Sequence, residues 1–221
     1  GKKKSQHRII ILIGLGEFCE KYSRFISFLC EQACDILIFE WPGLGLSGNF
    51  GNSPSTSHSE GFDELVKAGC DVIEEAGWGS SSFYFIGHSM GGHMAFRLTA
   101  LQKFKVNGII ALSPMMMPKI TPSLPIYFIA KLASIIGFGK CLIPQTGQNT
   151  LLKTRKFSSN NLLSRNREAI EHIIALINKN PSLARAGVSF GWLYSALYSC
   201  YKTTINPVFL QTIEPPVLIL V

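Results

Sequence analysis

Short apolar, β-branched runs recur along this chain and alternate with stretches long enough to hold helices. Five runs have the length of a strand, at residues 8–13, 35–39, 82–86, 107–112 and 217–221. The first four are separated by stretches that we expect to be helical, at residues 20–32, 62–75 and 91–102. Continuous apolar strands that alternate with helices are typical of a parallel sheet covered on both faces. We therefore predict an α/β fold in which a mostly parallel sheet is flanked by helices.

About a hundred residues separate the fourth and fifth expected strands, which is too long for a loop. This stretch carries helical patterns at residues 124–136, 166–178 and 192–201, so it is interpreted as an inserted helical cap or lid. The predicted domains are an incomplete core of residues 1–114 and 216–221 and a cap of residues 115–215. The first cap helix is apolar nearly all round, and we expect it to be buried as a lid.

The lengths of the apolar runs and the arrangement of the cysteines indicate the cellular compartment of the protein. No apolar run reaches the roughly 18 uncharged residues of a transmembrane helix. The basic first residues precede an apolar run, residues 9–15, that is too short for a secretory signal and is interpreted as a strand. The six cysteines contain no C-x-x-C pair and form no zinc ligand set, which favours reduced thiols in a cytoplasmic compartment. We expect no cofactor and no metal.

Charge is distributed unevenly along the chain. Residues 1–89 carry 7 Lys and Arg against 11 Asp and Glu, whereas residues 90–221 carry 14 against 3. Between Met90 and Arg167 there are 11 basic residues and no acidic one. Such a run fits either a solvated basic face or attraction to phosphate. Basic charge beside an apolar lid favours peripheral contact with an anionic membrane surface, at the inner face of the membrane. Nucleic acid is not expected, because no basic–aromatic stacking pattern accompanies the charge.

The third expected strand leads directly into the sequence Gly-His-Ser-Met-Gly-Gly at residues 87–92, and a helix-compatible stretch follows. This is a G-x-S-x-G motif between a strand and a helix, which is the context of a nucleophile elbow. Such an elbow holds its serine on a strained turn at the carboxyl end of the sheet, where α/β folds bind ligands. Ser89 is therefore the candidate nucleophile, and the structural members of the motif are Gly87, His88, Gly91 and Gly92.

A second motif follows the first expected strand, which ends at Gly14-Leu15-Gly16. In folds with a nucleophile elbow, the loop at this place supplies one oxyanion N–H group, and the residue after the nucleophile supplies the other. The candidate oxyanion donors are therefore the backbone N–H groups of Leu15 and Met90. Gly14 and Gly16 are the structural glycines of this loop.

A glycine-rich stretch at residues 43–48 matches the dinucleotide-binding pattern G-x-G-x-x-G. It follows an expected strand, and Asp63 lies about twenty residues further on. The residues after it, 49–54, cannot open a helix, so no helix N-terminus would meet a pyrophosphate. We therefore do not interpret this stretch as a nucleotide site.

Together these motifs resemble the α/β-hydrolase superfamily, and within it the monoacylglycerol lipase and bacterial lysophospholipase branch of serine aminopeptidase-like hydrolases. The resemblance covers most of the chain and rests on residues 14–22, 40–47, 58–63, 87–92, 112–115, 181–192 and 215–221. Residues 87–92 are the family's G-H-S-M-G-G without change. Departures include Pro42, where the family usually has Arg, and Ile13, where many members have His. The resemblance implies that the cap forms a pocket for an acyl chain.

The resemblance also implies an acid and a base, and neither is found in this chain. In the family an Asp follows the strand that residues 217–221 resemble, and a His comes in a later loop. After Ser89 the chain has no Asp; its later acids and histidines are Glu168, Glu171, Glu214, His93 and His172. The spacing of Glu168 and His172 is that of a surface pair on one helix. We expect the chain to be truncated at its C-terminus, with the acid and base beyond Val221.

The favoured function is hydrolysis of a lipid monoester, either a lysophospholipid or a monoacylglycerol, through an acyl-enzyme on Ser89. Two alternatives stay open at the level of sequence. One is a catalytically impaired relic or lipid-binding module that lacks the acid and base. The other is a different reaction on the same fold, namely thioester or peptide hydrolysis or acyl transfer.

Overall fold

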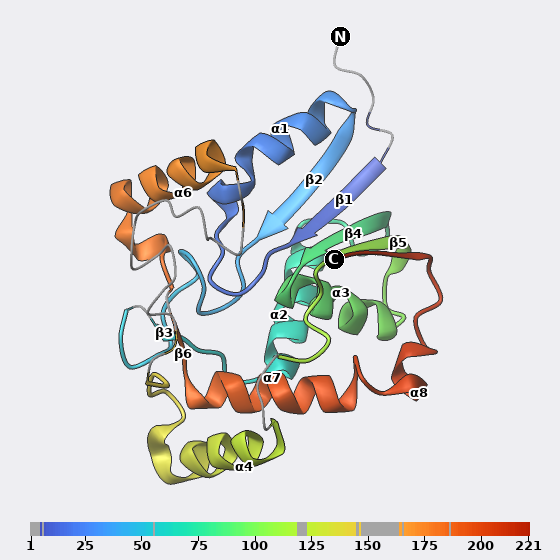
Figure 1. Cartoon of the computed structure of the whole chain (residues 1–221). Helices are drawn as coiled ribbons and strands as arrows, with labels where there is room; N and C mark the ends of the chain where they lie inside the picture. The colour runs from blue at the N-terminus through green and yellow to red at the C-terminus, as the bar shows by residue number, and fades with distance from the viewer. Residues whose placement is uncertain are drawn as a thin grey trace.

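The computed structural model is built around one five-stranded parallel sheet (Figure 1). It describes residues 5, 7–54, 56–118, 123–144, 146, 164, 166–185 and 187–221. The strands are β1 (His7–Leu12), β2 (Cys34–Phe39), β4 (Ser82–His88), β5 (Lys105–Leu112) and β7 (Val217–Leu220). Their spatial order is β2-β1-β4-β5-β7, and all neighbouring pairs are parallel. The predicted α/β fold with a parallel sheet is confirmed.

Helices pack on both faces of this sheet (Figure 1). Helix α1 (Ser23–Glu31) covers one face, where it packs against Ile9 and Ile11 of β1. Helices α2 (Phe62–Glu75) and α3 (Met90–Ala100) lie over the other face, and α7 (Phe190–Lys202) packs against these two helices. They share the main hydrophobic core with Ile10 and Leu12. The alternation along β1 arises because successive side chains of a strand point to opposite faces.

The expected helices form with small changes at their ends. The helix expected at residues 62–75 coincides with α2, and that expected at 91–102 is α3, which begins at Met90. The helix expected at 20–32 is divided into a 3₁₀ turn, η1 (Cys19–Tyr22), followed by α1. A 3₁₀ turn at the start of an α-helix is common, and sequence periodicity does not resolve it.

The residues between β5 and β7 form the β5–β7 segment, which is helical at the three places where helices were expected. Among its described residues, the helices are α4 (Ser123–Ala133), α6 (Arg167–Lys179), α7 and the short α8 (Pro207–Leu210). A 3₁₀ turn, η3 (Pro181–Leu183), follows α6. The segment also holds a strand that was not predicted, β6 (Gly187–Val188), paired in parallel with β3 (Thr56–Ser57). Two residues carry no periodicity, so this pairing has no sequence signal.

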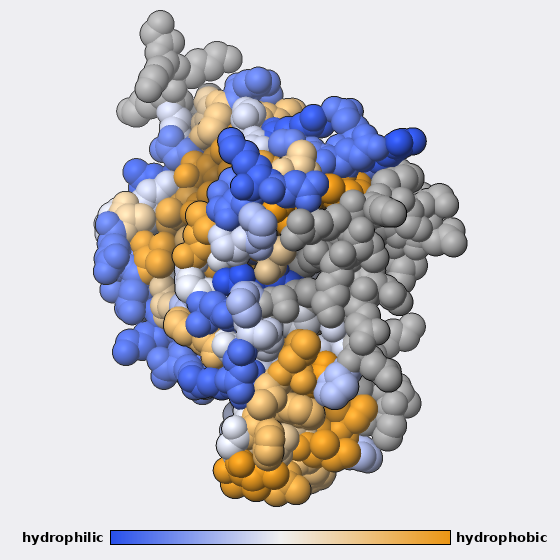
Figure 2. Space-filling view, turned by 90° about the vertical axis from the view of Figure 1, so that its left-hand side faces the viewer, coloured by the Kyte–Doolittle hydropathy of each residue, from blue (hydrophilic) through white to orange (hydrophobic). Residues whose placement is uncertain are grey.

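Helix α4 is not buried as expected. It lies outside α7, with Tyr127 against Tyr194 and Tyr201, so that α7 occupies the core positions and only Ala130 of α4 is buried. The chain continues from α4 into a π-helical turn, η2 (Ser134–Phe138). The large apolar side chains that are more than half exposed on these two elements are Leu124, Phe128, Ile129, Leu132, Ile135, Ile136 and Phe138. We call them the apolar patch; they form the orange lobe at the bottom of Figure 2.

The described helices include no candidate for a membrane-spanning segment. None of them is both long enough and apolar enough to cross a bilayer. Five of the basic residues counted between Met90 and Arg167 lie outside the described residues, namely Lys119, Lys153, Arg155, Lys156 and Arg165.

The turn from β4 into α3 depends on two glycines that allow the backbone to pack closely. A Cβ atom on Gly91 would overlap the carbonyl oxygen of Leu12 in β1. A Cβ atom on Gly87 would lie 2.6 Å from the carbonyl oxygen of Gly91. Neither neighbour is a side chain that can rotate away, so α3 can approach the sheet only with glycine at both positions.

We predict that Gly91→Ala destabilises the protein by about 3 kcal/mol, because backbone atoms must shift to admit the methyl group. Gly79→Ala is the matched control, since its Cβ would meet Glu74 Cγ at an ordinary 3.4 Å. Urea unfolding followed by circular dichroism measures both variants. Equal midpoints for the two variants would contradict the close packing of α3 on β1.

Candidate active site

Ser89 is the single residue between β4 and α3, and its backbone is strained. Its φ is 52° and its ψ is −114°, a combination that non-glycine residues rarely adopt and that occurs mostly at functional sites. The Ser89 N–H donates to the carbonyl of Leu112 at 2.9 Å, and the Ser89 carbonyl accepts from the N–H of Met115 at 2.9 Å. The half-buried Ser89 therefore lies at the carboxyl edge of the sheet, on a turn held by the end of β5.

The loop after β1 lies beside this turn, because Leu12 of β1 pairs with Gly87 of β4. The loop is closed by two hydrogen bonds. The Gly14 N–H donates to Glu17 Oε2 at 2.6 Å, and the Glu17 N–H donates to the Gly14 carbonyl at 3.3 Å. Leu15 is half-buried at the centre of this turn. One of the two candidate oxyanion donors thus belongs to a loop adjacent to the elbow.

The second candidate donor, Met90, begins α3. The N–H groups in the first turn of a helix have no partner within that helix, so they are available to a ligand. The other glycines of the two motifs have separate tasks. Gly16 turns the loop with a φ of 70°, and Gly92 packs on Pro114, whose Cβ would lie 2.8 Å from an added methyl carbon. Each glycine therefore serves a turn or a close contact.

Glu17 is a buried carboxylate that joins the loop after β1 to the elbow. Besides the Gly14 N–H, it accepts from the Tyr22 hydroxyl at 2.5 Å and from the ammonium of Lys21. Its Oε1 lies 3.0 Å from His88 Nδ1, so the residue before Ser89 contacts the same carboxylate. Burial raises the pKa of Glu17, but the adjacent imidazole of His88 and the charge of Lys21 outweigh burial and lower the pKa to about 2. Glu17 is therefore ionised at neutral pH.

His93 lies one turn of α3 after Ser89 but is fully buried. Its Nε2 contacts the Ser199 hydroxyl at 2.7 Å, and its Nδ1 contacts the Met115 carbonyl at 3.1 Å. Burial and the charge of Arg97 lower the pKa of His93 to about 3. Both ring nitrogens are occupied within the core, so His93 is a neutral structural residue in this arrangement.

The later acidic residues have partners away from the elbow. Glu168 binds Arg24 of α1 at 2.8 Å instead of pairing with His172, and Glu171 binds Arg167 at 2.7 Å. Glu214 accepts from the amide of Gln102 at 3.1 Å. The expected Glu168–His172 pair is therefore wrong, because the guanidinium of α1 is within reach of the carboxylate. Within the described ranges, no three His, Cys, Asp or Glu side chains gather into a potential metal site.

Arg185, a buried arginine just before β6, was not predicted as a functional residue from the sequence. Its guanidinium donates to the carbonyls of Gly43, Gly45 and Gly48 at 2.9 to 3.3 Å. These are the glycines of the stretch that matches the dinucleotide pattern, and their carbonyls face a cation of the chain itself. The only signal in the sequence is a lone arginine between small and apolar residues, which does not identify its partner.

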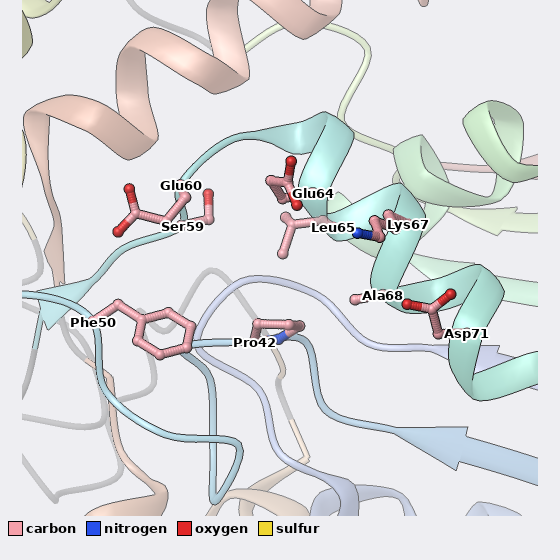
Figure 3. Close-up of a pocket in the computed structure, with 9 residues that line it drawn as sticks. All are labelled: Pro42, Phe50, Ser59, Glu60, Glu64, Leu65, Lys67, Ala68 and Asp71. Carbon is pink, nitrogen blue, oxygen red and sulfur yellow. The ribbon is translucent and has the colours of Figure 1, made fainter. Parts of the chain in front are cut away.

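A cavity of about 560 Å³ lies along α2, and Ser89 is not among the residues that line it. Figure 3 shows Pro42 and Phe50 on one side of it and the residues of α2 and its preceding loop on the other. Its charged lining residues are Glu60, Glu64, Lys67 and Asp71. The candidate nucleophile thus does not line this cavity, and the lining contains more acidic than basic side chains.

Solved structures of lipases have the same fold. The chain is similar to the monoacylglycerol lipase of Paleococcus ferrophilus, with a TM-score of 0.68 and 23% identity over 98% of this chain and 73% of that one. It is equally similar in fold to a soluble variant of monoglyceride lipase from Saccharomyces cerevisiae, solved with a substrate analog. That match has a TM-score of 0.68 and 17% identity over 99% of this chain and 68% of the other.

The amino-acid sequence is also similar to that of a mammalian lipase and to a family model. The chain is 25% identical to monoglyceride lipase of Mus musculus over 185 residues, which are 83% of this chain. The match spans only 55% of the mouse protein's length. The model of the family described as serine aminopeptidase, S33, matches residues 3–221. The chain therefore belongs to this serine-hydrolase family of the α/β-hydrolase fold.

Proposed function

We propose that this chain carries the nucleophile and the acyl-binding part of a serine ester hydrolase that acts on lipid monoesters, a monoacylglycerol or a lysophospholipid. The observation that carries the proposal is Ser89, held in a strained turn beside the loop of Leu15. The monoglyceride lipases among its relatives support the substrate class. In this proposal the β5–β7 segment serves as a cap that covers the acyl chain.

The proposed chemistry is an acyl transfer. Ser89 Oγ attacks the ester carbonyl carbon, and the resulting oxyanion accepts hydrogen bonds from the N–H groups of Leu15 and Met90. The C–O bond to the alcohol then breaks, the alcohol leaves with a proton, and water hydrolyses the acyl-enzyme. A base must take the proton of Ser89, and we do not assign that role to His93, since both of its ring nitrogens are occupied in the core.

A second candidate function is lipid binding without turnover. It is favoured by the same observation on His93, because an unassisted serine is a weak nucleophile. The two functions differ in one respect that can be measured, which is whether Ser89 forms a covalent bond.

We predict that an alkyl fluorophosphonate labels the protein at Ser89 and that Ser89→Ala abolishes the labelling. The matched control is Ser113→Ala, which removes the exposed serine after the neighbouring strand β5. Intact-mass spectrometry and peptide mapping measure the label. Equal labelling of wild type and Ser89→Ala contradicts the proposed nucleophile, and lipid binding without any label favours the second function.

The stability of the proposed oxyanion loop, residues 14–17, depends on the charge of Glu17. A carboxylate that accepts from a backbone N–H, a phenol and an ammonium stabilises the folded loop only while it is ionised. The folded-state pKa of Glu17 is about 2, below its ordinary value of 4.5. The stabilisation is therefore complete above pH 4.5 and is lost as the pH falls through about 2.

We predict that Glu17→Gln lowers the free energy of unfolding by about 3 kcal/mol near pH 7 and that this difference shrinks steadily below pH 4.5. Urea unfolding at a series of pH values measures it. The matched control is Glu20→Gln, because Glu20 is an exposed neighbour on η1. A difference that does not change between pH 7 and pH 3 would contradict the role of the Glu17 charge.

We also propose that the apolar patch of α4 and η2 contacts an anionic membrane surface, from which the lipid substrate would enter. The support is the exposure of the patch, in which Ile135 is 72% exposed and Phe128 62%. An apolar surface on a short helical element binds at the level of the lipid headgroups and gains affinity with the area that it buries. The basic residues between Met90 and Arg167 add attraction to anionic lipid.

We predict that the double variant Leu132→Asp/Ile135→Asp binds vesicles of phosphatidylcholine and phosphatidylserine at least about tenfold more weakly than wild type. Val208→Asp is the control, because Val208 is 71% exposed on α8, outside the patch. Vesicle co-sedimentation measures the affinity. Equal weakening by both changes indicates a general charge effect and contradicts docking through the patch.

A further inference from the structure

Arg185 is a buried cation whose hydrogen bonds all go to backbone carbonyls. It is 5% exposed, and no carboxylate binds it directly among the described residues. Its Nε and one terminal nitrogen donate to the carbonyls of Gly43, Gly45 and Gly48. The other terminal nitrogen donates to the carbonyls of Ser182 at 2.8 Å and Ala184 at 3.3 Å. Five bonds match the five donors of a guanidinium, so the fork is fully satisfied.

The loop that receives Arg185 is shaped to present carbonyl groups. Gly43, Gly45 and Gly48 have φ values of 87°, 49° and 90°, which place them in the left-handed region that favours glycine. Glu40 lies directly behind this loop, because a Cβ on Gly45 would overlap its carboxylate. Burial lowers the pKa of Arg185, and the nearby charge of Glu40 acts in the opposite direction. The loop is thus held between a buried cation and a carboxylate.

Glu40 connects this loop to the segment that follows the proposed oxyanion loop. Its Oε2 accepts from the Leu46 N–H at 2.5 Å, and its Oε1 accepts from the Cys19 N–H at 3.1 Å. Cys19 comes two residues after Glu17. We call residues 43–48 the glycine loop. Arg185 contacts the glycine loop, the glycine loop contacts Glu40, and Glu40 contacts the backbone of Cys19, two residues after Glu17.

A second contact joins the same two regions. Phe18, which is 1% exposed, packs against Ile177 of α6 and Leu183 of η3. Residues 177–185 of the β5–β7 segment are therefore linked to the chain after the oxyanion loop twice, once directly through apolar packing on Phe18 and once indirectly from Arg185 through residues 43–48 and Glu40. Two independent contacts on neighbouring residues indicate that this part of the segment fixes the loop's position.

We propose that Arg185 is a positioning residue that couples the cap to the oxyanion loop through Glu40. The coupling rests on the proposed function in one respect only, namely the role of the Leu15 N–H. Arg185 touches no reacting atom. It holds the glycine loop, the loop holds Glu40, and Glu40 holds the backbone at Cys19, two residues from the carboxylate that closes the oxyanion turn.

The test compares Arg185→Lys with Arg97→Lys. Lysine keeps the positive charge but replaces the planar five-donor fork by a point charge with three donors. Arg97 is the matched control, since its side chain is 15% exposed and it donates to Ser199 and Asp63 instead of to the glycine loop. Hydrogen exchange measured by NMR on the full chain reports the N–H groups of Leu46 and Cys19, which both donate to Glu40. The rate of fluorophosphonate labelling at Ser89 is the second readout.

We expect Arg185→Lys to accelerate exchange at Leu46 and Cys19 by about tenfold or more, while the amides of α3 keep their rates. Labelling of Ser89 should slow several-fold in Arg185→Lys and not in Arg97→Lys. Unchanged exchange at Cys19, or the same acceleration in both variants, overturns the coupling. Absence of any label in wild type overturns the proposed function instead, and the exchange rates then still decide whether Arg185 holds the backbone at Cys19.

Discussion

The close approach of α3 to β1 is the constraint on which the rest of this structure depends. Gly91 brings the first turn of the helix against the carbonyl of Leu12, and Gly87 lets the same turn fold back on β4. Ser89, the residue between them, must then adopt its strained φ of 52°. The same approach places the loop after β1 next to the helix N-terminus. Close packing, strain and the proposed oxyanion donors thus have one physical origin.

Two buried charges hold the loops around this centre, and both rely on backbone groups for solvation. Glu17 accepts from the N–H of Gly14, and Arg185 donates to the carbonyls of Gly43, Gly45 and Gly48. A buried charge that loses its partners is costly, so each loop has one strongly preferred position. Irregular segments can be rigid for this reason even though they lack ladders of hydrogen bonds.

Much of the fold could be predicted from sequence because its signals are local. The apolar runs marked all five strands of the sheet, and the G-x-S-x-G motif located the turn at Ser89. What could not be predicted depends on contacts between distant residues. The pairing of Thr56 with Gly187 and the bonds of Arg185 to Gly43, Gly45 and Gly48 span more than a hundred residues of chain. The exposure of α4 was missed for a related reason, since an apolar helix does not itself reveal whether α7 already occupies the core.

We propose that Ser89 attacks an ester while the backbone N–H groups of Leu15 and Met90 donate to the oxyanion. A crystal structure of the protein after reaction with an alkyl phosphonate tests it most directly, because the phosphonyl oxygen stands in for that oxyanion. We expect a covalent bond between phosphorus and Ser89 Oγ, with the phosphonyl oxygen about 2.7–3.1 Å from both backbone nitrogens. A phosphonate bound to another residue, or an oxygen held by neither N–H group, would contradict it.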